Sequence, residues 1–439
     1  MRFPLNFSGR TEIVMKKFTI AILGTGARGF VYGSLLAQNK EKFQITAICD
    51  FNKEQIAKAN KIFNLSQDAI FYNEDDFFGE KRADVLVIAT WDKEHVRQSI
   101  RAMELGYDIL LEKPISDSEE EIEELLKVQK KTGRKAVVCH VLRYGGSYKK
   151  VYELLKAGTV GRLIAIDAME RVAYWHQAQA YVRIQSAVND IAHPTILAKC
   201  CHDLDYIQHY AQSRCDTVSS VGGLSFFKAE NAPEGATDRC LNCPYVDSCV
   251  YSAKKIYIDR WIKEGRPKFV WPFNKVSLKN PNTEEDLYEG LKTTVFGKCV
   301  FKCGVDSNSG VVDHQMVQMH FENGVDATLK MLFTAQPGRR INLFGTHGEI
   351  ILDEIPGTIE VKRYGQDAEI INISELSKDA GYGHGGGDAG LINDLYSILT
   401  GEKQDYTSLT ESVESHLIGI KAEKSRLNGG ITLKVHDSI

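Results

Sequence analysis

A glycine-rich turn between two apolar segments constrains the fold of this chain more than any other sequence feature. The apolar run from Phe18 to Leu23 leads directly into the turn, and a second apolar run ends at Asp50. The turn consists of Gly24, Thr25, Gly26, Ala27, Arg28 and Gly29. Strand, G-x-G-x-x-G turn, helix and second strand in this order are typical of a dinucleotide-binding βαβ unit, although a tight turn in an ordinary α/β unit is the alternative.

Each position of this pattern has a physical role in binding a dinucleotide. Gly24 allows the tight turn, Gly26 lets the backbone approach a pyrophosphate, and Gly29 lets the new helix pack closely on the strand. The N-terminus of that helix, where Arg28 lies, offers free N–H groups to the phosphates. Asp50 follows the last glycine by about 20 residues, where a carboxylate accepts a hydrogen bond from the ribose 2′-OH. Because a carboxylate would repel a 2′-phosphate, the sequence predicts NAD as the cofactor.

The composition argues against several other classes of protein. The chain has 439 residues and a formal net charge of −4, so it has room for two or three domains and no basic surplus for nucleic acid. No apolar run approaches the roughly 18 residues of a membrane span, and residues 1–14 lack the apolar core of a secretory signal. Ten cysteines in a chain this long do not resemble a small disulfide-rich domain. We therefore expect a cytoplasmic protein with no membrane or nucleic-acid partner.

Further apolar segments alternate with helical segments in the first third of the chain. Ala83–Thr90, Tyr107–Pro114 and Lys135–Val141 have the composition of buried strands. This alternation predicts a parallel, doubly wound sheet, in which ligands bind at the carboxyl ends of the strands. The predicted cofactor-binding residues are Gly24, Gly26, Ala27, Arg28, Gly29, Asp50, Thr90, His95, Glu112 and Lys113.

A different pattern begins after Tyr144. Two segments of alternating polarity, Gln315–Phe321 and Val325–Phe333, flank Asn323-Gly324, which is the strongest short signal for a β-hairpin. More strand-like segments follow, and the last part of the chain has helical patterns. The sequence predicts an α/β Rossmann domain followed by an α+β domain with a large, mostly antiparallel open sheet.

These patterns also suggest domain boundaries. We expect an N-terminal arm at residues 1–16, the NAD-binding domain at 17–143, and a substrate and oligomerisation domain at 144–439. The last of these contains a cysteine-rich insertion at about 228–310, and its C-terminal helices are free to pack back on the first domain.

Several motifs resemble one family of oxidoreductases. They are Glu112-Lys113-Pro114, Tyr174-Trp-His176, Ala198–Asp205, Cys240–Ala253 and Gly385–Asp388. Together with the glycine turn and the open sheet, they resemble the glucose–fructose oxidoreductase, inositol dehydrogenase and MocA (Gfo/Idh/MocA) family over nearly the whole chain. The resemblance implies that Lys113 contacts both the nicotinamide ribose and a substrate hydroxyl. It also implies a homodimer or homotetramer that forms through the antiparallel sheet.

The family usually places an aspartate four residues before a histidine on one helix, with both side chains toward the substrate. The resemblance maps the histidine to His202, but the aspartate position holds Ala198. Lys199 shares a helical face with His202, so a lysine and histidine could replace the usual pair. Alcohol oxidation needs a proton acceptor, which we assign to His202, and an ammonium beside the alkoxide, which we assign to Lys113. The alternatives are a helix histidine satisfied by Asp205 and a solvated lysine at a strand end.

Aromatic and polar residues elsewhere are candidates for the wall of the substrate site. His176 could supply a second catalytic group or an aromatic wall for a sugar ring, whereas Trp175 could be core. The predicted substrate residues are Arg143, Tyr144, Tyr174, Trp175 and His176, and the predicted catalytic residues are Lys113, His202, Lys199 and His176. His384 and Asp388 lie on a glycine-rich stretch that either borders the pocket or only leads into a helix.

Five cysteines are concentrated in one part of the chain. Cys240 and Cys243 form a Cys-x-x-Cys pair, and Cys249, Cys299 and Cys303 follow. Thiolates at this spacing suit tetrahedral zinc or an iron–sulfur cluster. We assign a structural metal site to Cys240, Cys243, Cys249 and Cys303. Reduced thiols or disulfides are the alternatives.

The leading functional hypothesis is an NAD-dependent oxidoreductase that transfers a hydride to or from a secondary alcohol of a sugar, cyclitol or glycoside. The first alternative is an NAD-dependent glycoside hydrolase, which oxidises C3 transiently and then eliminates the leaving group. The second is a non-catalytic NAD-binding sensor, and the intact Glu-Lys-Pro motif around Lys113 argues against it.

Overall fold

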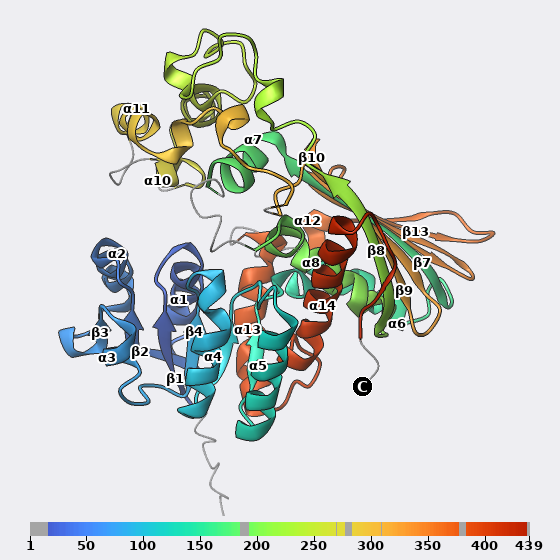
Figure 1. The fold of residues 1–439 in the computed structure, drawn as a ribbon. Coiled ribbons are helices and arrows are strands. Elements are labelled where there is room, and N and C mark those ends of the chain that lie inside the picture. The colour runs from blue at the N-terminus through green and yellow to red at the C-terminus, as the bar shows by residue number, and fades with distance from the viewer. Residues whose placement is uncertain are drawn as a thin grey trace, which may run out of the picture.

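Two β-sheets and a helical lobe make up the chain (Figure 1). The computed structural model describes residues 16–184, 193–268, 270–276, 283–308, 310–376 and 383–436. The predicted N-terminal arm lies outside the described residues except for its last residue. Within the described ranges, no helix combines the length and apolar character that crossing a bilayer requires.

The first sheet has six parallel strands in the order β3-β2-β1-β4-β5-β6. The strands are β1 (Phe18–Leu23), β2 (Phe43–Cys49), β3 (Ile70–Phe71), β4 (Val85–Ile88), β5 (Asp108–Leu111) and β6 (Ala136–Val138). The helices around it are α1 (Ala27–Gln38), α2 (Lys53–Phe63), α3 (Glu74–Phe77), α4 (His95–Glu104) and α5 (Glu119–Thr132). The central strands are buried on both faces, as their continuous apolar runs predict.

The second sheet has nine strands in the order β14-β13-β12-β11-β7-β10-β9-β8-β15. They are β7 (Leu163–Ala173), β8 (Cys215–Gly223), β9 (His314–Phe321), β10 (Asp326–Ala335), β11 (Gly338–Gly345), β12 (Gly348–Asp353), β13 (Thr358–Arg363), β14 (Glu369–Asn372) and β15 (Leu433–Lys434). Neighbouring strands are antiparallel except for β7 and β10, and the predicted hairpin at Asn323-Gly324 joins β9 to β10. The predicted fold class is confirmed.

Helices cover one face of the second sheet and form the lobe beyond it (Figure 1). The helices after the first sheet are α6 (Gly146–Lys156), α7 (Tyr174–His176), α8 (Thr195–Ala211), α9 (Arg260–Lys263), α10 (Phe273–Val276), α11 (Glu284–Thr293), α12 (Ile373–Leu376), α13 (Gly387–Thr400) and α14 (Leu409–Leu427). Helices α8 and α14 pack against each other and against the sheet. The segment between β8 and β9, which contains α9 to α11, has its own apolar cluster.

Helix α13 belongs late in the sequence but packs on the first sheet. Its residues Leu391, Ile392 and Leu395 share one apolar cluster with Ile20 and Val137 of that sheet. This packing carries the start of α13 to the carboxyl ends of the parallel strands, where ligands bind in such folds.

Candidate active site

The glycine turn has the shape that a dinucleotide requires. Gly24 has a φ of +88°, and a Cβ atom there would lie 2.5 Å from the carbonyl oxygen of Ala89. A Cβ on Gly29 would lie 1.9 Å from the carbonyl oxygen of Gly24, which shows how closely α1 packs on the turn. A Cβ on Gly26 would meet no atom within 4 Å, so the backbone here borders open space. These residues fit a bound pyrophosphate at the N-terminus of α1.

Asp50 lies beside this turn at the end of β2. Its Oδ2 accepts hydrogen bonds from the backbone N–H of Thr25 at 2.7 Å and from the Thr25 hydroxyl at 3.0 Å. Its Oδ1 accepts from the N–H of Asn52 at 2.8 Å. An ionised carboxylate offers about four acceptor positions, so Asp50 keeps capacity for a ribose hydroxyl.

Arg28 links three acidic or phenolic groups at the same edge of the sheet. Its Nε lies 2.6 Å from Glu112 Oε1, and its Nη2 lies 2.6 Å from Asp388 Oδ1. The hydroxyl of Tyr32 donates to Glu112 at 2.8 Å. Burial raises the pKa of Glu112, but the charges of Arg28 and Lys113 outweigh it and the net pKa is lowered. Glu112 is therefore a fixed anion at neutral pH.

Lys113 follows Glu112 directly after β5. Its Nζ lies 3.5 Å from the carbonyl oxygen of Ala198 on α8, so this lysine bridges from the first sheet to the helix across from it. Burial lowers the pKa of Lys113, but Cys201 and Glu112 raise it and the net pKa lies above its usual value. Lys113 therefore carries its positive charge at neutral pH.

His95 and Thr90 lie around the strand ends next to Lys113. The Nδ1 of His95 is 2.7 Å from the carbonyl oxygen of Pro114, and the histidine is fully buried. It therefore holds the backbone that follows Lys113 in place. The hydroxyl of Thr90 donates to Gln98 at 2.5 Å.

His202 lies on α8 with only 5% of its surface exposed. Neither of its ring nitrogens has a hydrogen-bond partner among the residues that the structure describes. Burial is the largest cause that lowers the pKa of His202 far below its usual value, and the charge of Lys113 is the next. The imidazole is therefore neutral at neutral pH.

Lys199 contacts a charged network that the sequence did not reveal. Its Nζ lies 3.0 Å from Glu170 Oε1. The Nε of Arg339 lies 2.7 Å from Glu170 Oε2 and 2.8 Å from Asp203 Oδ1. Glu170 and Asp203 lie far apart in the sequence, on β7 and α8, and no local pattern marks Arg339 as their shared partner. The predicted lysine is thus part of an ion-pair network with Glu170.

His176 lies among aromatic rings on the helical lobe. Its ring centroid is 5.7 Å from that of Trp175, 5.6 Å from that of Tyr181 and 4.8 Å from that of Trp271. Burial, followed by the charge of Lys199, lowers the pKa of His176 to about 3. The sequence analysis missed Trp271, which completes this aromatic cluster. Trp271 is 42% exposed, so this cluster is partly open to solvent.

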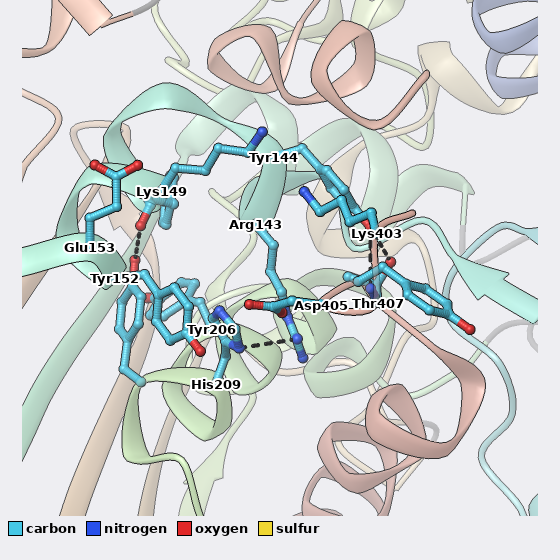
Figure 2. A pocket seen from close by; sticks show the side chains of 13 residues that line it. Arg143, Tyr144, Lys149, Tyr152, Glu153, Tyr206, His209, Lys403, Asp405 and Thr407 are labelled. Atoms are coloured by element: carbon cyan, nitrogen blue, oxygen red, sulfur yellow. Dashed lines mark hydrogen bonds between the residues drawn. The ribbon is translucent and has the colours of Figure 1, made fainter. Parts of the chain in front are cut away.

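Three predicted substrate residues have their contacts with other groups of the protein. Tyr174 is 40% exposed and its ring contacts that of Tyr251. Figure 2 shows Arg143 and Tyr144 in a separate cavity of about 300 Å³, whose lining includes neither Lys113 nor His202. The guanidinium of Arg143 binds both carboxylate oxygens of Asp205, at 2.7 and 2.6 Å, and the Tyr144 hydroxyl lies 3.0 Å from that of Thr407.

The predicted metal site is not supported. Among the described residues, no group of three or more histidines, cysteines or acidic residues is arranged to hold a metal ion. Cys240, Cys243, Cys249 and Cys299 line one small apolar cavity, and Cys303 is not part of its lining. The thiol of Cys303 instead donates to the carbonyl oxygen of Cys299 at 3.3 Å. All ten cysteines are free thiols, and the spacing of these thiols does not give a ligand sphere in the described part of the chain.

Comparisons with known proteins agree with this geometry. Residues 18–140 match the Gfo/Idh/MocA family model, described as an oxidoreductase family with an NAD-binding Rossmann fold. The chain is 22% identical over 403 residues to YteT of Bacillus subtilis (strain 168), a match that covers 87% of this chain and 89% of YteT. It is 20% identical over 175 residues to an inositol 2-dehydrogenase/D-chiro-inositol 3-dehydrogenase of Shouchella clausii (strain KSM-K16), which is 40% of this chain and only 50% of that enzyme.

A solved structure shares the complete fold. An oxidoreductase from Agrobacterium radiobacter, determined in complex with NAD+, L-tartaric acid and magnesium, superposes with a TM-score of 0.65 at 15% identity, and the match covers 96% of this chain and 99% of that one. The fold and the nucleotide-binding edge therefore define an oxidoreductase with an NAD-binding Rossmann domain. More specifically, residues 18–140 match the Gfo/Idh/MocA family, which the sequence motifs also resemble.

Proposed function

We propose that this protein is an NAD-dependent dehydrogenase that oxidises or reduces a secondary alcohol of a sugar, cyclitol or glycoside. The observation that carries the proposal is the pairing of a buried, charged Lys113 with a buried, neutral His202 whose ring nitrogens have no partner in the described part of the chain. Lys113 adjoins Glu112, which Arg28 of the glycine turn contacts. In this proposal, Lys113 is the cation and His202 the base beside the bound nucleotide.

The residues of the glycine turn and of β2 would hold the cofactor. Gly26 and the N-terminus of α1 fit the pyrophosphate, and Asp50 fits an adenosine ribose. Thr90 and Lys113, at the ends of β4 and β5, would border the nicotinamide. When bound, NAD accepts or delivers the hydride, and the protein orients the alcohol carbon toward it.

The chain's own residues would handle the proton and the charge. His202 removes the hydroxyl proton, and the ammonium of Lys113 stabilises the negative charge that develops on the oxygen. The aromatic cluster of Trp175, His176 and Trp271 offers faces for the apolar side of a sugar ring. Lys199 supplies a second cation at the same site through its contact with Glu170.

The test is a panel of cyclitols, sugars and glycosides, assayed with NAD+ for NADH formation and by mass spectrometry for product. We include myo-inositol because a matching relative is named for inositol. His202→Gln should lower turnover about 10²- to 10³-fold, because a general base contributes that much, while NAD+ affinity stays within about twofold. Glycoside cleavage without NADH would instead favour the hydrolase. Tight NAD+ binding with no chemistry on any compound would favour a sensor.

We also propose that the enzyme is cytoplasmic and oligomeric. Its ten free cysteines suit a reducing compartment. The second sheet leaves large apolar side chains exposed on several strands, among them Ile164, Met316 and Phe344. Such a face suits a second copy of the chain. Light scattering of the purified protein tests this, and a monomer at micromolar concentration would contradict it.

A further inference from the structure

The position one turn before His202 on its own helix cannot take a proton onward. Position 198, one turn before His202, holds an alanine, so α8 supplies no carboxylate there. The imidazole is buried beside the cation of Lys113, and a second positive charge at that place is unfavourable. A proton that His202 accepts from an alcohol must therefore leave before the next turnover.

His384 is the imidazole between His202 and solvent. The ring centroids of the two histidines lie 5.6 Å apart. The side chain of His384 is 35% exposed, and its Nδ1 lies 3.3 Å from Asp388 Oδ2. No hydrogen bond to its Nε2 is present within the described ranges. Asp388 can stabilise a positive charge on this ring.

The position of His384 is fixed by its backbone and by Asp388. His384 has a φ of +47°, and its neighbours Gly383 and Gly385 also have positive φ values. A non-glycine residue in this region is uncommon and costs roughly 1 kcal/mol or more, so its surroundings must hold it there. Asp388 is held in turn by Arg28, whose Nη2 lies 2.6 Å away. Although burial raises the pKa of Asp388, the hydrogen bonds from His384 and Arg28 hold it at about 2.

We propose that His384, positioned by Asp388, receives the substrate proton from His202 and passes it to solvent. This inference rests on the proposed function. The O–H bond of the alcohol breaks as an N–H bond forms on His202. Because the two rings share no direct hydrogen bond, the proton on the other nitrogen of His202 then moves through a bridging water to Nε2 of His384, while the Nδ1–H of His384 stays directed at Asp388. Water takes the proton from His384, and in the reductive direction the same steps run in reverse.

His140 is the other histidine beside His202, and it is a poorer exit. Its ring centroid lies 5.9 Å from that of His202, but it is completely buried. Burial, then the charges of Arg143 and Lys113, lowers its pKa far below the usual value. A proton on His140 would be close to two cations and without access to water, whereas one on His384 faces Asp388 and solvent.

The first experiment measures turnover across pH in His384→Gln. With the best substrate of the panel, we expect at least about a tenfold loss of kcat near pH 7, a smaller loss at high pH where hydroxide takes the proton, and partial rescue by added imidazole. NAD+ affinity and thermal stability should stay near those of the wild type. His320→Gln is a matched control, because His320 forms a similar pair with Asp326 on the second sheet, at 2.7 Å, and should change nothing.

The second experiment needs no substrate. Nitrogen-15 NMR of histidine-labelled protein, with His384→Gln to assign the signal, reports which ring nitrogen carries the proton in neutral His384. The proposal requires the Nδ1–H form, which leaves Nε2 free to accept.

Four results would overturn the inference. They are an Nε2–H form of His384, an unchanged pH profile in an active His384→Gln enzyme, a loss that imidazole fails to restore, and a pH-dependent loss in His140→Asn but not in His384→Gln. If the wild type itself transfers no hydride with any compound, the proposed function fails first and the proton path fails with it.

Discussion

The two sides of the candidate active site differ in how their polar groups are satisfied. On the side of the first sheet, Arg28 contacts Glu112 and Asp388, each at 2.6 Å, and the charges compensate one another. On the side of α8, His202 is buried with both ring nitrogens unpartnered in the described part of the chain. Buried polar groups are normally hydrogen-bonded, so the unpartnered imidazole of His202 needs an explanation that the ion pairs of Arg28 do not.

The difference separates residues that hold the site from residues that react in it. A closed set of ion pairs is expensive to disturb and fixes the positions of Glu112 and Asp388. An unpartnered imidazole is unfavourable for stability, and it is retained where a ligand supplies the missing partner. Substitutions that break the ion pairs should therefore lower stability, whereas substitutions of the reacting residues should lower turnover.

The largest effect should come from Lys113→Met, which removes the charge that bridges the two sides. We expect kcat to fall about 10³-fold, because an electrostatic contact made to a developing charge contributes on that order. The measurement is steady-state kinetics together with calorimetry of NAD+ binding. Lys127→Met, at an exposed helix position, should leave both unchanged. An active Lys113→Met enzyme would refute the assignment of this lysine.

Arg28→Met should instead disrupt the ion pairs that Arg28 makes with Glu112 and Asp388 on the side of the first sheet. It leaves the buried carboxylates of Glu112 and Asp388 uncompensated, and we expect a loss of about 3–5 kcal/mol in the free energy of unfolding at pH 7. Urea denaturation measures this. Arg97→Met is the control, because Arg97 is 55% exposed in its ion pair with Glu74 and should cost less than about 1 kcal/mol. Equal losses in the free energy of unfolding for Arg28→Met and Arg97→Met would contradict the difference between the two sides of the site.

The buried histidines should make stability fall in mild acid. Burial and the charge of His140 lower the pKa of His416 to about 3, below the value of about 6.5 in the unfolded chain. Between these values the unfolded state binds the additional proton, so stability is lost as the pH falls below about 6.5. His416→Gln should reduce the slope of the free energy of unfolding against pH by about 1.4 kcal/mol per pH unit. An unchanged slope in denaturation curves from pH 7 to 5 would count against neutral burial of this residue.

The smallest effect should follow from Asp50→Asn. The amide still accepts a hydrogen bond but no longer repels a 2′-phosphate, so the preference for NAD+ over NADP+ should fall about tenfold. Calorimetry with both cofactors measures the ratio. Thr25→Val, which removes only the 3.0 Å hydroxyl contact to Asp50, should keep the preference. Tighter NADP+ binding by the wild type would remove the basis of the cofactor prediction.

Much of the fold was predictable because its signals are local. The glycine turn, the hairpin at Asn323-Gly324 and the helix Leu409–Leu427 depend on residues within a few positions of one another. Strand β8 has a weaker alternating pattern and β3 has only two residues, so neither was predicted. The register and pairing of the strands depend on segments that are distant in the sequence, so a local periodic pattern does not predict them.

The candidate site was predictable only where a motif carries its chemistry. Lys113 and His202 could be found from their motifs, but the contact between Lys199 and Glu170 joins α8 to β7 and has no sequence signature. The cysteines show that spacing along the chain does not determine which thiols come together. The spacing suggested four ligands including Cys303, whereas Cys240, Cys243, Cys249 and Cys299 line one cavity.

The ion pair between Arg28 and Asp388 joins two residues separated by 360 positions. Helix α13, which begins beside Asp388, also covers apolar residues of the first sheet. During synthesis the first strands therefore emerge long before the segment that neutralises their guanidinium and shields their apolar surface. A nascent chain stopped short of α13 would hold the glycine turn without the carboxylate of Asp388 that pairs with Arg28, so the first domain is completed only after α13 has been synthesised.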